Sequence, residues 1–135
     1  MKKLLMVFGI IFLMNSCSAG KAMQFERGHL QTALDKAKKE NKPVFVDFYT
    51  TWCGPCKMME KTVFTKSNVS KFYNKNFINI KIDAEKGEGR NLAAKYNVAG
   101  FPCLIYLDGN GKVIHKELGY INANMMVELG KKVAN

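Results

Sequence analysis

The first clear hydrophobic pattern lies in residues 30–37, where four apolar side chains recur at i, i+3, i+4 and i+7. This spacing predicts the buried face of a helix, and the polar residues before Pro43 end that helix near Glu40. Residues 43–49 follow as an apolar run of β-branched and aromatic side chains, which predicts a strand buried on both faces. A short stretch at residues 23–25 predicts a first strand before the helix.

Beyond residue 50 the apolar spacing changes repeatedly between the helical period and the strand period. The loop at residues 108–111 contains two glycines and is a strong hairpin signal. The predicted elements are a helix from about Gly54, a helix capped by Ser67 or Asn68 and ending at Asn74, a strand at 77–83, a helix around 92–96, paired strands at 103–107 and 112–118, and a last helix whose apolar face carries Met125, Met126, Leu129 and Val133.

This order of elements predicts an α/β fold, in which a central mixed β-sheet has helices on both faces. The chain has 135 residues, of which 47% are apolar and 24% are charged. That composition is ordinary for a single globular domain with a full core. We place the domain at residues 21–135 and expect it to be a monomer.

Residues 1–20 have the features of a secretory signal peptide rather than of the fold. Lys2 and Lys3 precede an apolar stretch at residues 4–13, which is too short to cross a bilayer as a helix. Small residues follow it, as expected near a cleavage site. The sequence therefore predicts an exported protein of the bacterial periplasm or cell envelope.

Two interpretations of the end of this segment compete. Signal peptidase could cleave after Ala19, or Cys17 could be the lipidated cysteine of a bacterial lipoprotein. We favour lipidation of Cys17, because cysteine is rare at the end of an unmodified signal. Acyl chains on Cys17 would anchor the protein to a membrane.

The chain is basic, with a formal net charge of +10 that falls to +8 without Lys2 and Lys3. The lysines are scattered, and no aromatic residues interleave them as a nucleic-acid platform would require. The charge therefore indicates a solvated basic surface, and we expect no nucleic-acid partner.

Cys53 and Cys56 lie three positions apart, where the predicted strand ends and the next helix begins. A thiol at a helix N-terminus is held near unpaired N–H groups, which favour the thiolate. Because the thiolate attacks disulfides, this position suits Cys53 for attack and Cys56 for resolution. We expect Cys53 to be the exposed thiol and Cys56 to lie one turn inside the helix.

A zinc site and a structural disulfide are the two other interpretations of the cysteine pair. A zinc site needs further paired ligands, but Cys17 and Cys103 are unpaired in the sequence and His29 and His115 are isolated. We therefore predict no metal. A structural disulfide would close a loop so short that it removes little chain entropy.

The motif Trp52, Cys53, Gly54, Pro55, Cys56 resembles the active-site region of the thioredoxin family, and Gly100-Phe101-Pro102 is similar to that family's cis-proline loop. The resemblance covers about residues 25–130. No proline interrupts the helix after the motif, as in exported thioredoxin-like proteins and the C-terminal domain of transmembrane disulfide reductases.

This resemblance implies a thioredoxin fold and a protein-disulfide reductase that needs no cofactor besides the Cys53–Cys56 redox disulfide. Trp52, Gly54, Pro55 and Pro102 would support the site. Implied partners are proteins with disulfides and a membrane or thioredoxin-reductase-type electron donor. The alternative is a thioredoxin-like adaptor in which the cysteine pair is structural.

Asp47 is an ionisable residue inside the apolar strand at 43–49. A buried carboxyl group tends to have a raised pKa, because burial disfavours the charged form. In thioredoxins an Asp at the matching position is read as the general acid/base for the buried cysteine. The resemblance thus implies that Asp47 is catalytic and serves Cys56.

Cys103 follows the predicted cis-proline, where the family usually has Thr. One interpretation makes Cys103 a small core residue, because free Cys is among the most buried residue types. The other makes it a third thiol near Cys56, since the Pro102 loop packs against the cysteine turn in this family.

Overall fold

A computed structural model describes residues 22–135 of the chain. The predicted signal peptide and the lipidation site at Cys17 lie outside the described residues. Within residues 22–135, no helix combines the length and the apolar character needed to cross a membrane.

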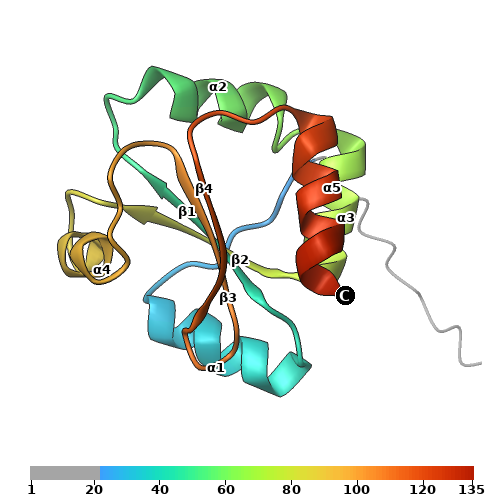
Figure 1. Cartoon of the computed structure of the whole chain (residues 1–135), viewed down its shortest axis with the longest axis horizontal. Helices are drawn as coiled ribbons and strands as arrows, with labels where there is room; N and C mark the ends of the chain where they lie inside the picture. Colours follow the sequence, from blue (N-terminus) through green and yellow to red (C-terminus); the bar gives the residue numbers. More distant parts are fainter. Residues whose placement is uncertain (1–21) are drawn as a thin grey trace, which may run out of the picture.

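Nine helices and strands make up residues 22–135, and Figure 1 shows them around a central sheet. The elements are α1 (Leu30–Glu40), β1 (Val44–Tyr49), α2 (Gly54–Thr62), α3 (Ser67–Asn76), β2 (Ile78–Asp83), α4 (Gly89–Lys95), β3 (Cys103–Leu107), β4 (Val113–Leu118) and α5 (Ala123–Ala134).

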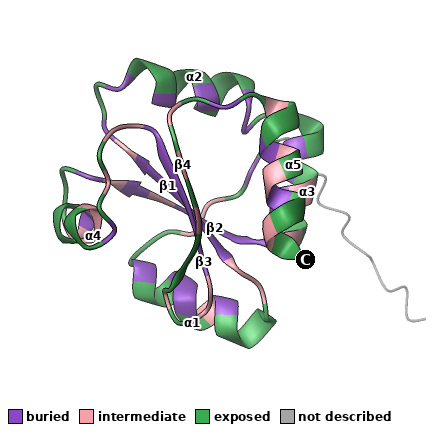
Figure 2. Cartoon of the chain, viewed as in Figure 1, coloured by how far each residue is buried: buried purple, intermediate pink, exposed green. Residues whose placement is uncertain are grey.

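The sheet has four strands in the order β2-β1-β3-β4. Strand β1 pairs in parallel with β2 and antiparallel with β3, and β4 pairs antiparallel with β3. The α/β prediction with a mixed sheet is therefore confirmed, including the hairpin that joins β3 and β4. The two inner strands, β1 and β3, are buried almost throughout (Figure 2).

Two hydrophobic clusters cover the two faces of the sheet. One contains apolar side chains of α1 together with Val46 and Ile105, and parts of α4 pack against it. The other contains Phe45 and Leu104 together with Met59 of α2 and buried residues of α3 and α5. Alternate residues of β1 and β3 thus point to opposite helix layers, as the period of a strand requires.

Three local predictions were wrong. Residues 23–25 form no strand, and only Glu26 makes an isolated parallel bridge to Ile80. Lys66, without a side-chain hydrogen bond, occupies the cap position of α3 that Ser67 or Asn68 was expected to fill. Met125 is exposed, so it does not belong to the buried face of α5 on which it was expected.

Candidate active site

The sharp change from β1 to α2 places the two cysteines at the start of a helix. Cys53 is the N-cap residue of α2, and Gly54 and Pro55 begin the helix itself. Proline suits a first helical turn, because it has no N–H group to leave unpaired there. Cys56 falls in that same first turn.

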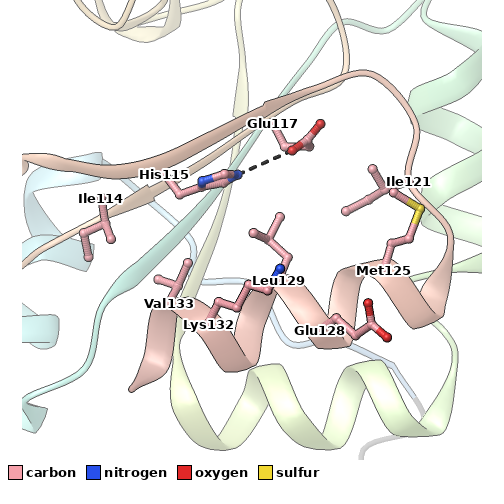
Figure 3. A pocket seen from close by; sticks show the side chains of 9 residues that line it. All are labelled: Ile114, His115, Glu117, Ile121, Met125, Glu128, Leu129, Lys132 and Val133. Atoms are coloured by element: carbon pink, nitrogen blue, oxygen red, sulfur yellow. Dashed lines mark hydrogen bonds and ion pairs between the residues drawn. The ribbon is translucent and has the colours of Figure 1, made fainter.

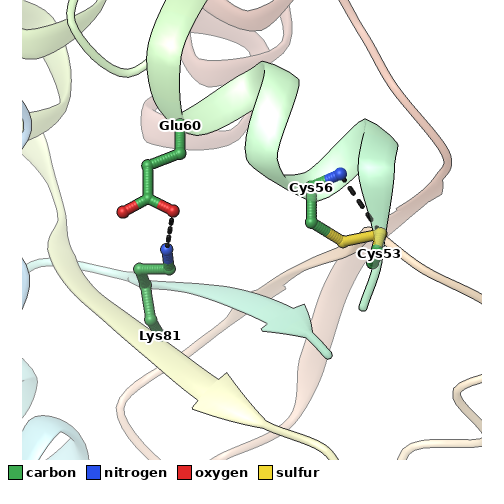
Figure 4. Close-up of a disulfide and its surroundings, with 4 residues drawn as sticks. All are labelled: Cys53, Cys56, Glu60 and Lys81. Carbon is green, nitrogen blue, oxygen red and sulfur yellow. Dashed lines mark hydrogen bonds and ion pairs between the residues drawn. A yellow bond between two sulfur atoms is a disulfide. The ribbon is translucent and has the colours of Figure 1, made fainter. Parts of the chain in front are cut away.

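Cys53 and Cys56 form a disulfide at this helix start (Figure 4). The Cys53 sulfur accepts a hydrogen bond from the backbone N–H of Cys56, with 3.1 Å between the two atoms. The sulfur therefore occupies the place of a capping oxygen, where an anion is stabilised by the helix dipole.

The expected exposure of Cys53 is wrong for this disulfide form. Cys53 is 3% exposed and Cys56 is 5% exposed, so the structure does not distinguish the two by accessibility. The distinction that remains is position, because only Cys53 is the capping residue.

Trp52, the residue before Cys53, connects the start of α2 to the loop that contains Pro102. Trp52 is 66% exposed; its indole N–H donates to a carboxylate oxygen of Glu85, and its ring meets that of Phe101 edge to face at 6.1 Å between centroids. The Phe101–Pro102 peptide bond is cis. The Pro102 carbonyl accepts a hydrogen bond from Gly119, which ties this loop to the end of β4.

Asp47 is buried in the middle of β1, on the face of the sheet that α2 covers. Its β3 partner Leu104 and its β1 neighbour Phe45 both belong to the cluster that contains Met59 of α2. The Asp47 side chain is 2% exposed, and its Oδ1 atom has no hydrogen-bond partner among the described residues. Burial raises the pKa of Asp47 to about 7.

Lys81 and Glu60 belong to this electrostatic environment, and the sequence interpretation missed both. Lys81 is directly opposite Asp47 in the β1–β2 pair, and its Nζ lies 3.0 Å from a carboxylate oxygen of Glu60 (Figure 4). Against the dominant effect of burial, Lys81 lowers the pKa of Asp47, whereas Glu60 raises it.

A signal for Lys81 existed in the sequence. Ile78, Ile80 and Ile82 alternate along β2 and join the α1-side cluster, so Lys81 must point to the other face, towards α2. Glu60 follows Cys56 by four residues, which puts both on one side of α2. Lys81 and Glu60 both occupy positions where a charged side chain is ordinary, so their link to Asp47 becomes visible only once the strand register is known.

Cys103 is a free, fully buried cysteine at the start of β3. It belongs to the cluster on the α1 side of the sheet, whereas Met59 of α2 belongs to the other cluster. Burial raises the pKa of the Cys103 thiol. This placement supports the interpretation as a core residue over that of a third thiol beside Cys56.

The arrangement combines a disulfide at the start of α2 with a buried carboxyl group on the face of the sheet that α2 covers. Reduction of the disulfide would leave the Cys53 sulfur at the helix cap, where a thiolate is favoured. A carboxyl group with a pKa near 7 can both take and give a proton near neutral pH. Among residues 22–135, no group of three or more His, Cys, Asp or Glu side chains could hold a metal ion.

Comparison with known proteins matches residues 30–134 to the family described as Thioredoxin-like domain. The chain is also 31% identical, over 102 residues, to the thiol:disulfide interchange protein DsbD of Pseudomonas fluorescens. That match covers 73% of this chain and 18% of DsbD, so the chain corresponds to a small part of that relative.

Two solved structures are similar over most of the chain. A proposed disulphide-isomerase from Bacteroides thetaiotaomicron is 38% identical, with a TM-score of 0.75 over 84% of this chain and 94% of that one. The oxidised C-terminal domain of DsbD from Neisseria meningitidis is 29% identical, with a TM-score of 0.65 over 82% of this chain and 98% of that domain.

Proposed function

Because this chain belongs to the thioredoxin-like family, we propose that it is an exported protein-disulfide reductase that works through Cys53 and Cys56. The chain is a thioredoxin-like thiol–disulfide oxidoreductase with Cys53 and Cys56 in the Cys-x-x-Cys position. The observation that carries the proposal is the Cys53 sulfur at the cap of α2, where it accepts the Cys56 N–H.

The proposed reaction begins with the reduced protein. The Cys53 thiolate attacks one sulfur of a substrate disulfide; the substrate S–S bond breaks, and the other substrate sulfur leaves as a thiolate that takes a proton from water. The product of this step is a mixed disulfide between Cys53 and the substrate.

The second step releases the substrate. Asp47 accepts the proton of the Cys56 thiol, and the resulting thiolate attacks the Cys53 sulfur. The second substrate sulfur leaves as a thiolate, and the Cys53–Cys56 disulfide forms. Two electrons have then passed from the dithiol to the substrate, and a thiol-containing or membrane electron donor must reduce the protein again.

We propose that the substrate binds at Trp52 and the loop that contains Pro102. Trp52 offers an exposed ring beside Phe101, and the Phe101 backbone precedes Pro102 in a loop that an extended substrate segment could pair with. The reducing direction is further supported by Gly54-Pro55 between the cysteines, which is typical of the reducing members of the family.

The rate at which dithiothreitol reduces insulin, measured with and without the protein, tests this function. We expect catalytic amounts of the protein to accelerate precipitation of the insulin B chain, since that reaction needs a cycling dithiol. A variant in which both Cys53 and Cys56 are Ser is the matched control. If the wild-type protein is no faster than this control, the adaptor alternative with a structural cysteine pair becomes the better account.

We also propose that Cys17 anchors the exported protein through lipid. Cell fractionation should place the wild-type protein with membranes, because two or more acyl chains bind a bilayer stably. Cys17→Ala should release it to the soluble fraction, while Ser18→Ala should not. A wild-type protein that is already soluble would instead support cleavage after Ala19.

A further inference from the structure

The two edges of the sheet differ in how they are protected. Beside β2, residues 23–26 cover the outer edge: the Glu26 N–H donates to the Asn79 carbonyl, and the Asn79 side chain donates to the Gln24 carbonyl. Strand β4 is the last strand on the other side, and no described element pairs with its outer edge. Its outward N–H and C=O groups are therefore a template for another strand.

The side chains of β4 are unusually apolar for an open edge. Val113 is 39% exposed, Ile114 is 48% exposed and Leu118 is 55% exposed, whereas edge strands are normally protected by outward charges or proline. The ammonium group of Lys116 is directed away from the edge, because it donates to the backbone carbonyls of Tyr96 and Asn97. Figure 2 shows β4 in the colours of intermediate and exposed residues.

An open groove runs between β4 and α5, with a volume of about 390 Å³ (Figure 3). His115 and Glu117 line it from the strand, and Leu129 and Val133 line it from the helix. The groove therefore adds apolar surface beside the strand edge on the α5 side of the sheet.

In place of the monomer expected from the sequence, we propose that β4 is a self-association surface, on which β4 of a second copy of this chain pairs antiparallel and extends the four-stranded sheet to eight strands. In a symmetric antiparallel pair, opposite residues share one face of the combined sheet. A pair centred on Lys116 places Ile114 of each copy opposite Leu118 of the other. It also places His115 of each copy, whose Nε2 lies 3.4 Å from a carboxylate oxygen of Glu117 in its own chain (Figure 3), opposite Glu117 of the other.

This self-complementarity is the reason for choosing a second copy over an unrelated peptide. The apolar pairs lie on one face, and the His115–Glu117 pairs on the face of the groove. Shifting the centre by one residue sets His115 against His115 or Glu117 against Glu117, so that identical polar side chains lie opposite each other. The two Lys116 residues lie opposite each other at the centre of the pair. Their ammonium groups do not meet there, because each donates to backbone carbonyls of its own chain.

The proposed pairing keeps the two active-site loops apart from each other. Gly119, at the carboxyl end of β4, bonds to Pro102 of the active-site loop. In an antiparallel pair the carboxyl ends of the two β4 strands point away from each other, so the two active-site ends lie at opposite ends of the dimer. A strand pair with two shallow grooves buries a modest area, which is typical of a weak, concentration-dependent dimer.

Sedimentation equilibrium of the full chain in density-matched detergent tests the pairing. We expect a reversible monomer–dimer equilibrium, and Ile114→Lys should weaken it about tenfold or more, because a lysine then faces Leu118 at two places. Met58→Lys is the matched control: Met58 is also a half-exposed apolar residue, at 54%, but it lies on α2. It should leave the equilibrium unchanged.

A charge exchange tests the register independently of Ile114. His115→Glu should weaken the dimer roughly tenfold by setting two Glu pairs opposite each other, and adding Glu117→Lys should restore it to within about twofold. Thermal unfolding of each variant verifies the fold. A chain that is monomeric at every concentration, a dimer unaffected by Ile114→Lys, or a double variant as weak as His115→Glu would each overturn the proposal.

Discussion

Cys53→Ser is expected to abolish insulin reduction, with a loss of at least about a thousandfold, because the variant has no nucleophile for the substrate disulfide. A serine hydroxyl at the cap of α2 can still accept the Cys56 N–H, as the Cys53 sulfur does. The fold should therefore survive, and the loss reports chemistry rather than unfolding. Circular dichroism of the variant provides that control.

Cys56→Ala is expected to stop the reaction one step later. Cys53 can still attack, but no thiolate in α2 resolves the mixed disulfide, so the complex with substrate should accumulate. Mass spectrometry after non-reducing separation would identify it. If Cys56→Ala instead remained as active as the wild-type protein, or if Cys53→Ser trapped the substrate, the assignment of attack and resolution would be reversed or wrong.

The same variant decides the role of Cys103. Its side chain packs with the α1-side cluster, on the opposite face of the sheet from Met59 of α2. We therefore expect Cys56→Ala to give mixed or intermolecular disulfides of Cys53 and no bond from Cys53 to Cys103. A Cys53–Cys103 disulfide in that variant, absent when Cys103 is also changed to Thr, would establish the third thiol.

The strand and helix periods of the apolar residues were enough to predict most of the fold. The buried run of β1 and the helical spacing in α1 placed these elements to within a residue, because long apolar patterns leave few alternatives. The segment at residues 23–25 was misplaced, since its backbone is held by side chains such as Asn74 and Asn79 rather than by a regular ladder.

The cysteine pair was visible in the sequence, but the charges around it were not. Asp47 could be found because it interrupts an apolar strand. The link of Glu60 to Lys81 depends on the fold bringing a side chain of α2 to one of β2, a tertiary relation that no local pattern encodes. The burial of Cys53 was missed because accessibility in the disulfide form depends on packing around the bond and not on helix position.

Asp47→Asn is expected to stabilise the oxidised protein above pH 7 while leaving it nearly unchanged at low pH. Burial raises the pKa of Asp47 from 3.8 to about 7 in the folded chain, so the folded state holds a proton that the unfolded chain releases. Wild-type stability therefore falls as pH rises from about 4 to about 7 and is constant above that range. Asparagine removes this penalty, a gain on the order of 4 kcal/mol near pH 8.

Urea unfolding of the oxidised protein at a series of pH values measures this difference. Asp35→Asn on the exposed face of α1 is the matched control and should shift stability little. Lys81→Met should move the midpoint of the pH dependence upward, since Lys81 lowers the pKa of Asp47. A stability difference between wild type and Asp47→Asn that does not change with pH would show that Asp47 is ionised normally in the folded protein.

The activity of Asp47→Asn should move in the opposite direction. Without a carboxylate to accept the Cys56 proton, resolution of the mixed disulfide must wait for water or the leaving substrate thiolate, and we expect turnover to fall roughly tenfold. The loss should lie in the resolving step, so stopped-flow alkylation of Cys53 should be unaffected while the mixed disulfide persists longer. A variant that is more stable and equally fast would mean that Asp47 is a buried charge without a role in proton transfer.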